Sequence, residues 1–142
     1  MKSIYTDIII NASAEKVWSI LMDFSKFPEW NPFVLSIEGK QEAGAQLKVV
    51  LKNGNSTSVF RPKVVAIDQN KTFEWLGSLP VPGIFNGQHR FGIQKITDSQ
   101  VRFMQSEQFS GLLAGIIMKQ IGERTKQGFM AMNEALRERA ER

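Results

Sequence analysis

The spacing of apolar residues changes twice along the chain, and this change constrains the fold more than any other feature. From residue 33 to residue 109, apolar and polar residues alternate with the period of two that is typical of half-buried strands. Short separators rich in Gly, Asn, Asp, Ser and Pro interrupt this stretch, so consecutive strands are expected to pair as antiparallel hairpins. The six strands predicted here cover residues 33–38, 45–51, 58–67, 72–79, 84–96 and 100–109. Pro62 lies inside one of them, which predicts an edge position or a bulge there.

The segments on either side of this stretch carry the helices. A further strand is predicted over 3–10, and Ser13 after it can cap a short helix. Pro32 excludes helix in the residue before it. After Gly111 the apolar period returns to 3.6, which predicts one amphipathic helix of about 25–30 residues. Gly122 and Gly128 lie within this helix, where they either permit a close approach to a sheet or only loosen the helix. The apolar positions of the helix are Leu113, Ile117, Ile121, Phe129, Met132 and Leu136, with Thr125 filling the gap between Ile121 and Phe129.

Together these elements predict a single α+β domain over residues 1–142. The chain length of 142 residues is that of one domain, and a hydrophobic content of 42% supplies a full core. Seven antiparallel strands are expected to form a curved sheet with the helices gathered on one face. A long helix that crosses a strongly curved sheet need not pack against it along its whole length. An apolar ligand site between the helix and the sheet is therefore physically possible.

The chain holds few reactive side chains. It has no cysteine and one histidine, His89, which excludes disulfides, thiol nucleophiles, cysteine zinc sites and histidine metal cages. It has no G-x-S-x-G motif, since Ser110 before Gly111 lacks the first glycine, and no P-loop or dinucleotide motif. We therefore expect no metal and no cofactor. Any chemistry must use carboxylates, hydroxyls, amides and one imidazole.

The distribution of charge argues against nucleic acid as a partner. The net charge is +4, but the basic residues are scattered, and near the C-terminus they are interleaved with acidic residues. At the N-terminus, residues 2–14 are similar to a signal peptide, yet Asp7 interrupts the apolar region. The longest other apolar run, 111–118, is too short to cross a membrane. We expect a cytoplasmic protein without stable membrane insertion, either a monomer or a homodimer.

Several short motifs occur along the chain in an order that is similar to a known family. They are Val17-Trp18, Phe27-Pro28-Glu29-Trp30-Asn31-Pro32-Phe33, Phe60-Arg61-Pro62, Phe73-Glu74-Trp75-Leu76-Gly77, His89-Arg90-Phe91 and Glu107-Gln108-Phe109-Ser110-Gly111-Leu112-Leu113. With these motifs the chain resembles, from about Ile4 to Leu136, the START-related (SRPBCC) superfamily and its small bacterial polyketide cyclase/dehydrase-like proteins. The resemblance implies a helix-grip fold, in which a curved antiparallel sheet grips the C-terminal helix around a deep apolar cavity. It also implies a small-molecule function, because members bind lipids, sterols, polyketides, plant hormones or quinones, and some catalyse cyclisation or dehydration.

His89 is the candidate polar centre of such a site. If 97–99 form a three-residue loop, Ile96 pairs with Gln100 and His89 lies opposite Glu107 on the next strand. Opposed residues have Cβ atoms about 5 Å apart, which permits contact between the imidazole and the carboxylate. The pair could orient a polar group of a ligand, transfer protons as catalytic residues, or only satisfy hydrogen bonds in the core. A register slip of one residue would place the two side chains on opposite faces.

The other candidate site residues are mostly aromatic and lie on inward strand faces, where core packing explains them as well as a cavity wall does. The apolar hairpin tip at 80–85 and the apolar start of the last helix could gate the mouth of a cavity. The candidate ligand-binding residues are Trp75, His89, Phe91, Phe103, Gln105, Glu107, Phe109 and Ile117, and the candidate gate residues are Pro82, Phe85 and Leu113.

These features and the resemblance favour binding of a small hydrophobic or amphipathic ligand, such as a lipid, polyketide or quinone-like molecule, between the sheet and the C-terminal helix. One alternative is a cyclase/dehydratase-type enzyme that uses His89 and Glu107 for proton transfer. A second alternative is a protein-interaction module without a physiological ligand, which would use the long helix or the apolar residues at its start.

Overall fold

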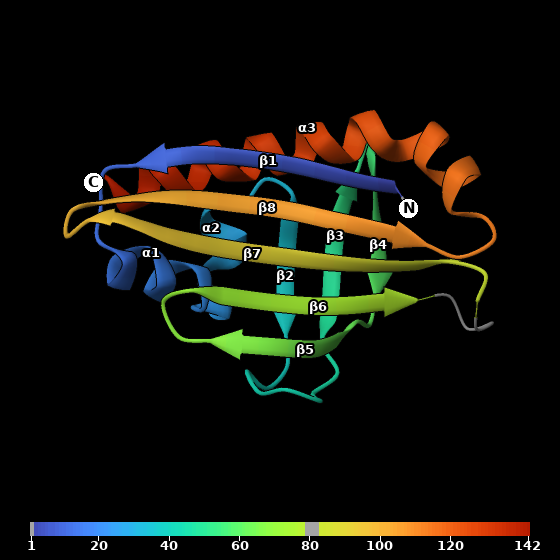
Figure 1. Ribbon diagram of the computed structural model, residues 1–142, viewed down its shortest axis with the longest axis horizontal. Coiled ribbons are helices and arrows are strands. Elements are labelled where there is room, and N and C mark those ends of the chain that lie inside the picture. The colour runs from blue at the N-terminus through green and yellow to red at the C-terminus, as the bar shows by residue number, and fades with distance from the viewer. Residues whose placement is uncertain (1, 79–82) are drawn as a thin grey trace.

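The computed structural model describes residues 2–78 and 83–142, and these form eight strands in two antiparallel sheets (Figure 1). The larger sheet has the order β1 (Lys2–Ile10), β8 (Gln100–Ser110), β7 (Asn86–Thr97), β6 (Thr72–Ser78) and β5 (Lys63–Asp68). The smaller sheet has the order β2 (Val34–Glu38), β3 (Lys48–Asn53) and β4 (Ser56–Phe60). In Figure 1 the strands of the smaller sheet run across those of the larger sheet. The prediction of an α+β helix-grip fold is confirmed at this level.

The prediction of seven strands was wrong, because residues 58–67 do not form one strand. Arg61 and Pro62 separate β4 from β5, and these two strands belong to different sheets. Pro62 has no N–H to donate to a strand ladder, but its carbonyl accepts a hydrogen bond of 2.8 Å from the N–H of Leu47. A bridge between Gln46 and Lys63 lies beside it. These contacts join the two sheets at a corner, so that together they curve around the interior.

Two short helical segments precede the smaller sheet. The helix α1 (Ala14–Leu21) begins as predicted, with Oγ of Ser13 accepting a hydrogen bond of 3.1 Å from the N–H of Lys16. The 3-10 turn η1 (Phe24–Lys26) and the helix α2 (Phe27–Trp30) follow. Buried Asn31 then leads the chain into β2, because its Oδ1 accepts hydrogen bonds from the N–H groups of Phe33 and Val34 at 3.0 and 2.9 Å.

The predicted long C-terminal helix is α3 (Ala114–Ala140), which runs along β1 at the top of Figure 1. Its two halves are buried to different extents. Phe129 and Leu136 in the second half are fully buried, whereas Ile117 and Ile121 in the first half are only half-buried. The second half therefore packs closely against the sheet, and the first half stands away from it. Among the described residues, no helix is both long enough and apolar enough to cross a membrane.

The two glycines inside α3 have different surroundings. A Cβ atom at Gly128 would overlap ring atoms of Phe33, so the glycine permits close approach between the helix and the start of β2. A Cβ atom at Gly122 would lie 3.5 Å from Cε of Met118, which is ordinary van der Waals contact within the helix. Gly128 is therefore a packing requirement, whereas Gly122 is not.

Candidate functional site

A cavity of about 410 Å³ lies between the first half of α3 and the two sheets. Its volume falls within the range of roughly 300–1,000 Å³ that is usual for small-molecule sites. The wall is largely aromatic and draws on both sheets. The aromatic residues that line it are Phe33, Phe60, Trp75, Phe85 and Phe109. Since the helix stands away from the sheet where this cavity lies, the space is a consequence of the fold and not a defect in core packing.

His89 and Glu107 lie in this lining as a directly opposed pair on β7 and β8, as the sequence predicted. The turn that sets this register differs from the predicted one, because Thr97 pairs with Gln100. A register shift between Lys95 and Thr97 leaves one extra residue on β7. Beyond this shift Lys95 pairs with Val101, and His89 pairs with Glu107 as expected. Nδ1 of His89 lies 3.0 Å from Oε1 of Glu107, and the two side chains are 3% and 18% exposed.

Gly87 makes room for the carboxylate of this pair. It lies two residues before His89 on β7, on the same face of the strand. A Cβ atom at Gly87 would overlap Oε2 of Glu107, so this oxygen lies over the glycine backbone. Both residues line the cavity, and the carboxylate can therefore meet a ligand there.

A chain of buried polar groups continues from the other side of His89. Nε2 of His89 lies 3.0 Å from Oε1 of Gln105, whose Nε2 donates to the carbonyl of Phe129 at 3.2 Å and to Oδ1 of Asn133 at 2.8 Å. Nδ2 of Asn133 in turn donates to Oγ1 of Thr6 at 3.0 Å. These side chains come from β7, β8, α3 and β1. The network therefore ties the closely packed half of α3 to the larger sheet.

This network assigns the protons on the imidazole. A backbone carbonyl only accepts, so the Gln105 amide directs its NH₂ group toward Phe129 and its oxygen toward His89. That oxygen also only accepts, and Nε2 of His89 therefore carries a hydrogen. Nδ1 and Glu107 then share one proton, because an unprotonated Nδ1 against a carboxylate would bring two acceptors together. Such a pair can accept a hydrogen bond from a ligand, or exchange a proton with it.

Aromatic rings hold the imidazole in place on its remaining sides. The ring centroid of His89 lies 5.1 Å from that of Trp75, 4.3 Å from that of Phe91 and 4.8 Å from that of Phe129. Because hydrogen bonds fix both nitrogens and rings pack on the faces, His89 has little freedom to change rotamer. Its position is therefore set before any ligand arrives.

The residues that the sequence suggested for the site fall into three places. Trp75, His89, Glu107, Phe109 and the suggested gate residue Phe85 all line the cavity. The remaining suggested residues that the structure describes lie outside the lining: Phe91, Phe103, Gln105, Ile117 and Leu113. Pro82 lies outside the described residues.

These other residues lie either in the core behind the cavity wall or before the part of α3 that lines the cavity. Phe91 and Phe103 stack on each other in the core, with ring centroids 6.4 Å apart. Gln105 lies behind His89 and is fully buried in the polar network. Leu113 precedes α3 and is 39% exposed, and Ile117 is half-buried one turn before the helix residues that line the cavity.

Sequence reasoning missed the residues that the smaller sheet and α3 contribute. Phe33 and Phe60 line the cavity because the corner at Pro62 turns the smaller sheet toward the interior. On α3, the lining residues are Ile121, Arg124 and Thr125, which have the i, i+3, i+4 spacing of one helix face. That spacing was the available signal, since Ile121 and Thr125 both lie on the predicted stripe and only Arg124 lies beside it.

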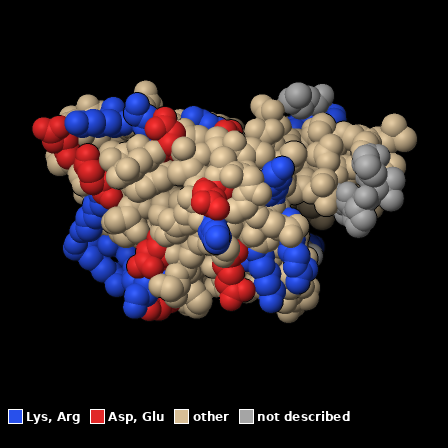
Figure 2. All heavy atoms as spheres, turned by 90° about the horizontal axis from the view of Figure 1, so that it is seen from below, with Lys and Arg blue, Asp and Glu red and all other residues tan. Residues whose placement is uncertain are grey.

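The charged residues do not gather by sign on the face seen from below. On the face that Figure 2 displays, Lys and Arg are interspersed with Asp and Glu, as the sequence predicted. Among the described residues, no three His, Asp or Glu side chains gather as metal ligands would. The cavity with its His89–Glu107 pair is therefore the candidate functional site.

The shape of the molecule is shared with solved structures. The Zhui aromatase/cyclase from a Streptomyces species has a TM-score of 0.80 at 13% identity, with 99% of this chain and 94% of that chain covered. A START superfamily protein from Mycobacterium smegmatis has a TM-score of 0.73 at 20% identity, with 98% and 97% covered. The di-domain aromatase/cyclase BexL has a TM-score of 0.75 at 8% identity; 96% of this chain is covered, but it spans only 46% of BexL. At these identities the likeness establishes the fold alone.

The curved sheet, the long helix and the cavity between them thus give the chain the fold of START superfamily proteins. A family-level sequence match is more specific. The family described as polyketide cyclase/dehydrase and lipid transport matches residues 1–141, and the chain belongs to that family. No curated protein matches the chain by sequence.

Proposed function

We propose that the protein binds a small apolar or amphipathic molecule in the cavity beneath α3. The observation that carries this proposal is the cavity of about 410 Å³, which has aromatic walls and one hydrogen-bonded polar pair. A ligand that buries about 200 Å² of apolar surface there gains roughly 5 kcal/mol before the costs of binding, at ~25 cal/mol per Å². Glu107, held by His89, accepts a hydrogen bond from the ligand and so sets its orientation.

A fluorescence titration with N-phenyl-1-naphthylamine tests this proposal, because the probe is neutral, aromatic and bright only in apolar surroundings. We expect saturable binding at micromolar concentration. Thr125→Trp places a bulky ring in the lining and should weaken probe binding more than tenfold. Lys119→Trp is the matched control, since Lys119 is exposed on the same helix and lies outside the lining. Equal binding by both variants would show that the probe does not enter the cavity, and the proposal would fail.

A second candidate function is proton transfer in a cyclase or dehydratase reaction. The observation that favours it is the placement of the Glu107 carboxylate in the lining with the buried His89 imidazole behind it. A carboxylate in this position can remove a proton from the carbon next to a ligand carbonyl, while the imidazole stabilises the change of charge. Family membership and the fold shared with aromatase/cyclases support the same chemistry.

Deuterium incorporation separates these two functions. In D₂O, the methyl group of 2-acetonaphthone exchanges its protons slowly unless a base is positioned beside it. If Glu107 is a base, the wild-type protein accelerates this exchange, and Glu107→Gln loses at least a hundredfold of the acceleration. The glutamine variant keeps the shape of the side chain, so its affinity for the ketone should change only a few-fold. Equal exchange rates for the two proteins would leave binding as the function.

A further inference from the structure

The charges that line the cavity are divided between its floor and its rim. Glu107 and His89 lie in the floor, where their side chains are 18% and 3% exposed. Lys52 on β3 and Arg124 on α3 are exposed and lie at the rim. Among the described lining residues these four are the only ionisable groups. The cavity therefore has a cationic mouth, an apolar middle and one carboxylate at its inner end.

The fold brings the two rim cations to the same opening from opposite sides. Arg124 reaches from α3 toward the β3–β4 turn, because its Cζ and Nη1 lie 3.9 Å from where a Cβ atom at Gly54 would be. Gly54 has a φ of 66°, a left-handed conformation that permits this tight turn. Lys52 lies two residues before Gly54 on the same hairpin. The hydroxyl-bearing residues Ser58, Ser78 and Thr125 belong to the same lining.

We infer that the rim is an anion subsite, so that the ligand is an acidic amphiphile whose carboxylate or phosphate group lies between Lys52 and Arg124. This inference rests on the proposed binding of a ligand in the cavity. An anion that entered the apolar interior head first would lose its hydration there without gaining a free cationic partner, because His89 is already paired with Glu107. The rim cations attract the same anion and leave it in contact with water. The ligand thus enters with the end opposite its acidic group, where any hydrogen-bond donor meets Glu107, and holds its acidic group at the mouth.

Three ten-carbon competitors of N-phenyl-1-naphthylamine test this inference: decanoate, decyl phosphate and decanol. Their chains are the same, and only the head group changes. We expect both anions to displace the probe at concentrations at least tenfold lower than decanol does. The ratio between decanoate and decyl phosphate then distinguishes a carboxylate ligand from a phosphate ligand. Equal displacement by decanol and by the two anions would overturn the anion subsite.

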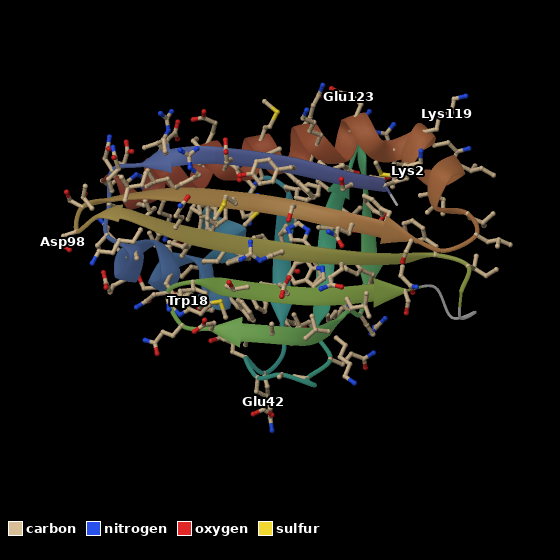
Figure 3. All side chains as sticks on the ribbon, in the orientation of Figure 1. Lys2, Trp18, Glu42, Asp98, Lys119 and Glu123 are labelled. Atoms are coloured by element: carbon tan, nitrogen blue, oxygen red, sulfur yellow. The ribbon has the colours of Figure 1, made fainter. Side chains whose placement is uncertain are left out.

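Charge-neutralising variants test which residues attract the anionic head group. Lys52→Gln and Arg124→Gln should each raise the concentration of anion needed for displacement by about fivefold, as expected for partly exposed charges, and leave decanol unchanged. Raising the ionic strength should act in the same direction. The matched control is Lys119→Gln, because Lys119 points outward from α3 in Figure 3 and lies outside the lining. If Lys119→Gln acts like the rim variants, the subsite is refuted, whereas failure of the probe itself to bind would refute cavity binding.

Discussion

The two glycines inside α3 provide a matched pair of substitutions with opposite expected effects. Replacing glycine by alanine in a helix interior stabilises a protein by about 1 kcal/mol. Gly122→Ala keeps this gain, because the new methyl group meets only the flexible end of Met118 at 3.5 Å. At Gly128, the methyl group would overlap Cδ1 and Cε1 of Phe33. An added methyl group therefore has space at position 122 but overlaps a neighbouring side chain at position 128.

The magnitude at Gly128 depends on whether the ring of Phe33 can move away. Phe33 is 7% exposed and packs edge-on against Phe129, with ring centroids 5.7 Å apart, so its ring can move only toward the cavity that it lines and would lose this contact. Overpacking of this kind costs typically about 1–3 kcal/mol, which exceeds the gain in helix propensity. At an overpacking cost of about 2 kcal/mol, the net loss at Gly128 is about 1 kcal/mol. With roughly 2–4 °C per kcal/mol for a domain of this size, Gly128→Ala should lower Tm by about 2–4 °C, and Gly122→Ala should raise it by about the same amount.

Thermal and urea unfolding, followed by circular dichroism, measure both effects. Phe33→Leu in the Gly128→Ala background should recover part of the loss, because leucine lacks the overlapping ring atoms. If Gly128→Ala is as stable as Gly122→Ala, then α3 does not approach β2 as closely as described. The division of the helix into a packed half and a cavity-lining half would then be refuted.

Three further substitutions test the buried polar groups and one surface charge. Gln105→Leu should destabilise the fold by about 3 kcal/mol in urea unfolding, because its buried hydrogen-bond partners lose their bonds while the volume is nearly kept. Asn31→Ala should cost about 2 kcal/mol in the same assay, since two backbone N–H groups lose their acceptor. Hydrogen bonds from Lys26 first, and then from Arg139, lower the pKa of Glu29. Its contribution to stability is thus present above the unfolded pKa and lost as pH falls through the folded pKa, so Glu29→Gln should lower Tm at neutral pH but not in acid.

Local sequence patterns predicted the part of the fold that hairpins and helix periodicity determine. The pairing of His89 with Glu107 was predicted correctly, but the predicted three-residue turn was wrong, because Thr97 pairs with Gln100 and a register shift between Lys95 and Thr97 restores the pairing. The cap at Ser13 and the length of α3 follow from equally local signals. These are the features that the structure confirms.

Long-range contacts determined what the sequence could not predict. The assignment of β4 and β5 to different sheets depends on Gln46 and Leu47, which meet the chain again at Lys63 and Pro62. The cavity wall depends on the same corner, since it turns Phe60 inward. The polar face of α3 is a second example. Its Arg124 resembles a solvent-facing helix residue until the distance between the helix and the sheet is known.

Native mass spectrometry of the protein purified from cells, followed by organic extraction, tests whether the cavity beneath α3 is a ligand site. We predict an additional mass of a few hundred daltons on the wild-type protein and on Lys119→Trp, and its loss from Thr125→Trp, whose new ring fills the cavity. An additional mass retained equally by Thr125→Trp would place the molecule elsewhere, for example on the exposed residues Leu112 and Ile116, and would contradict the account.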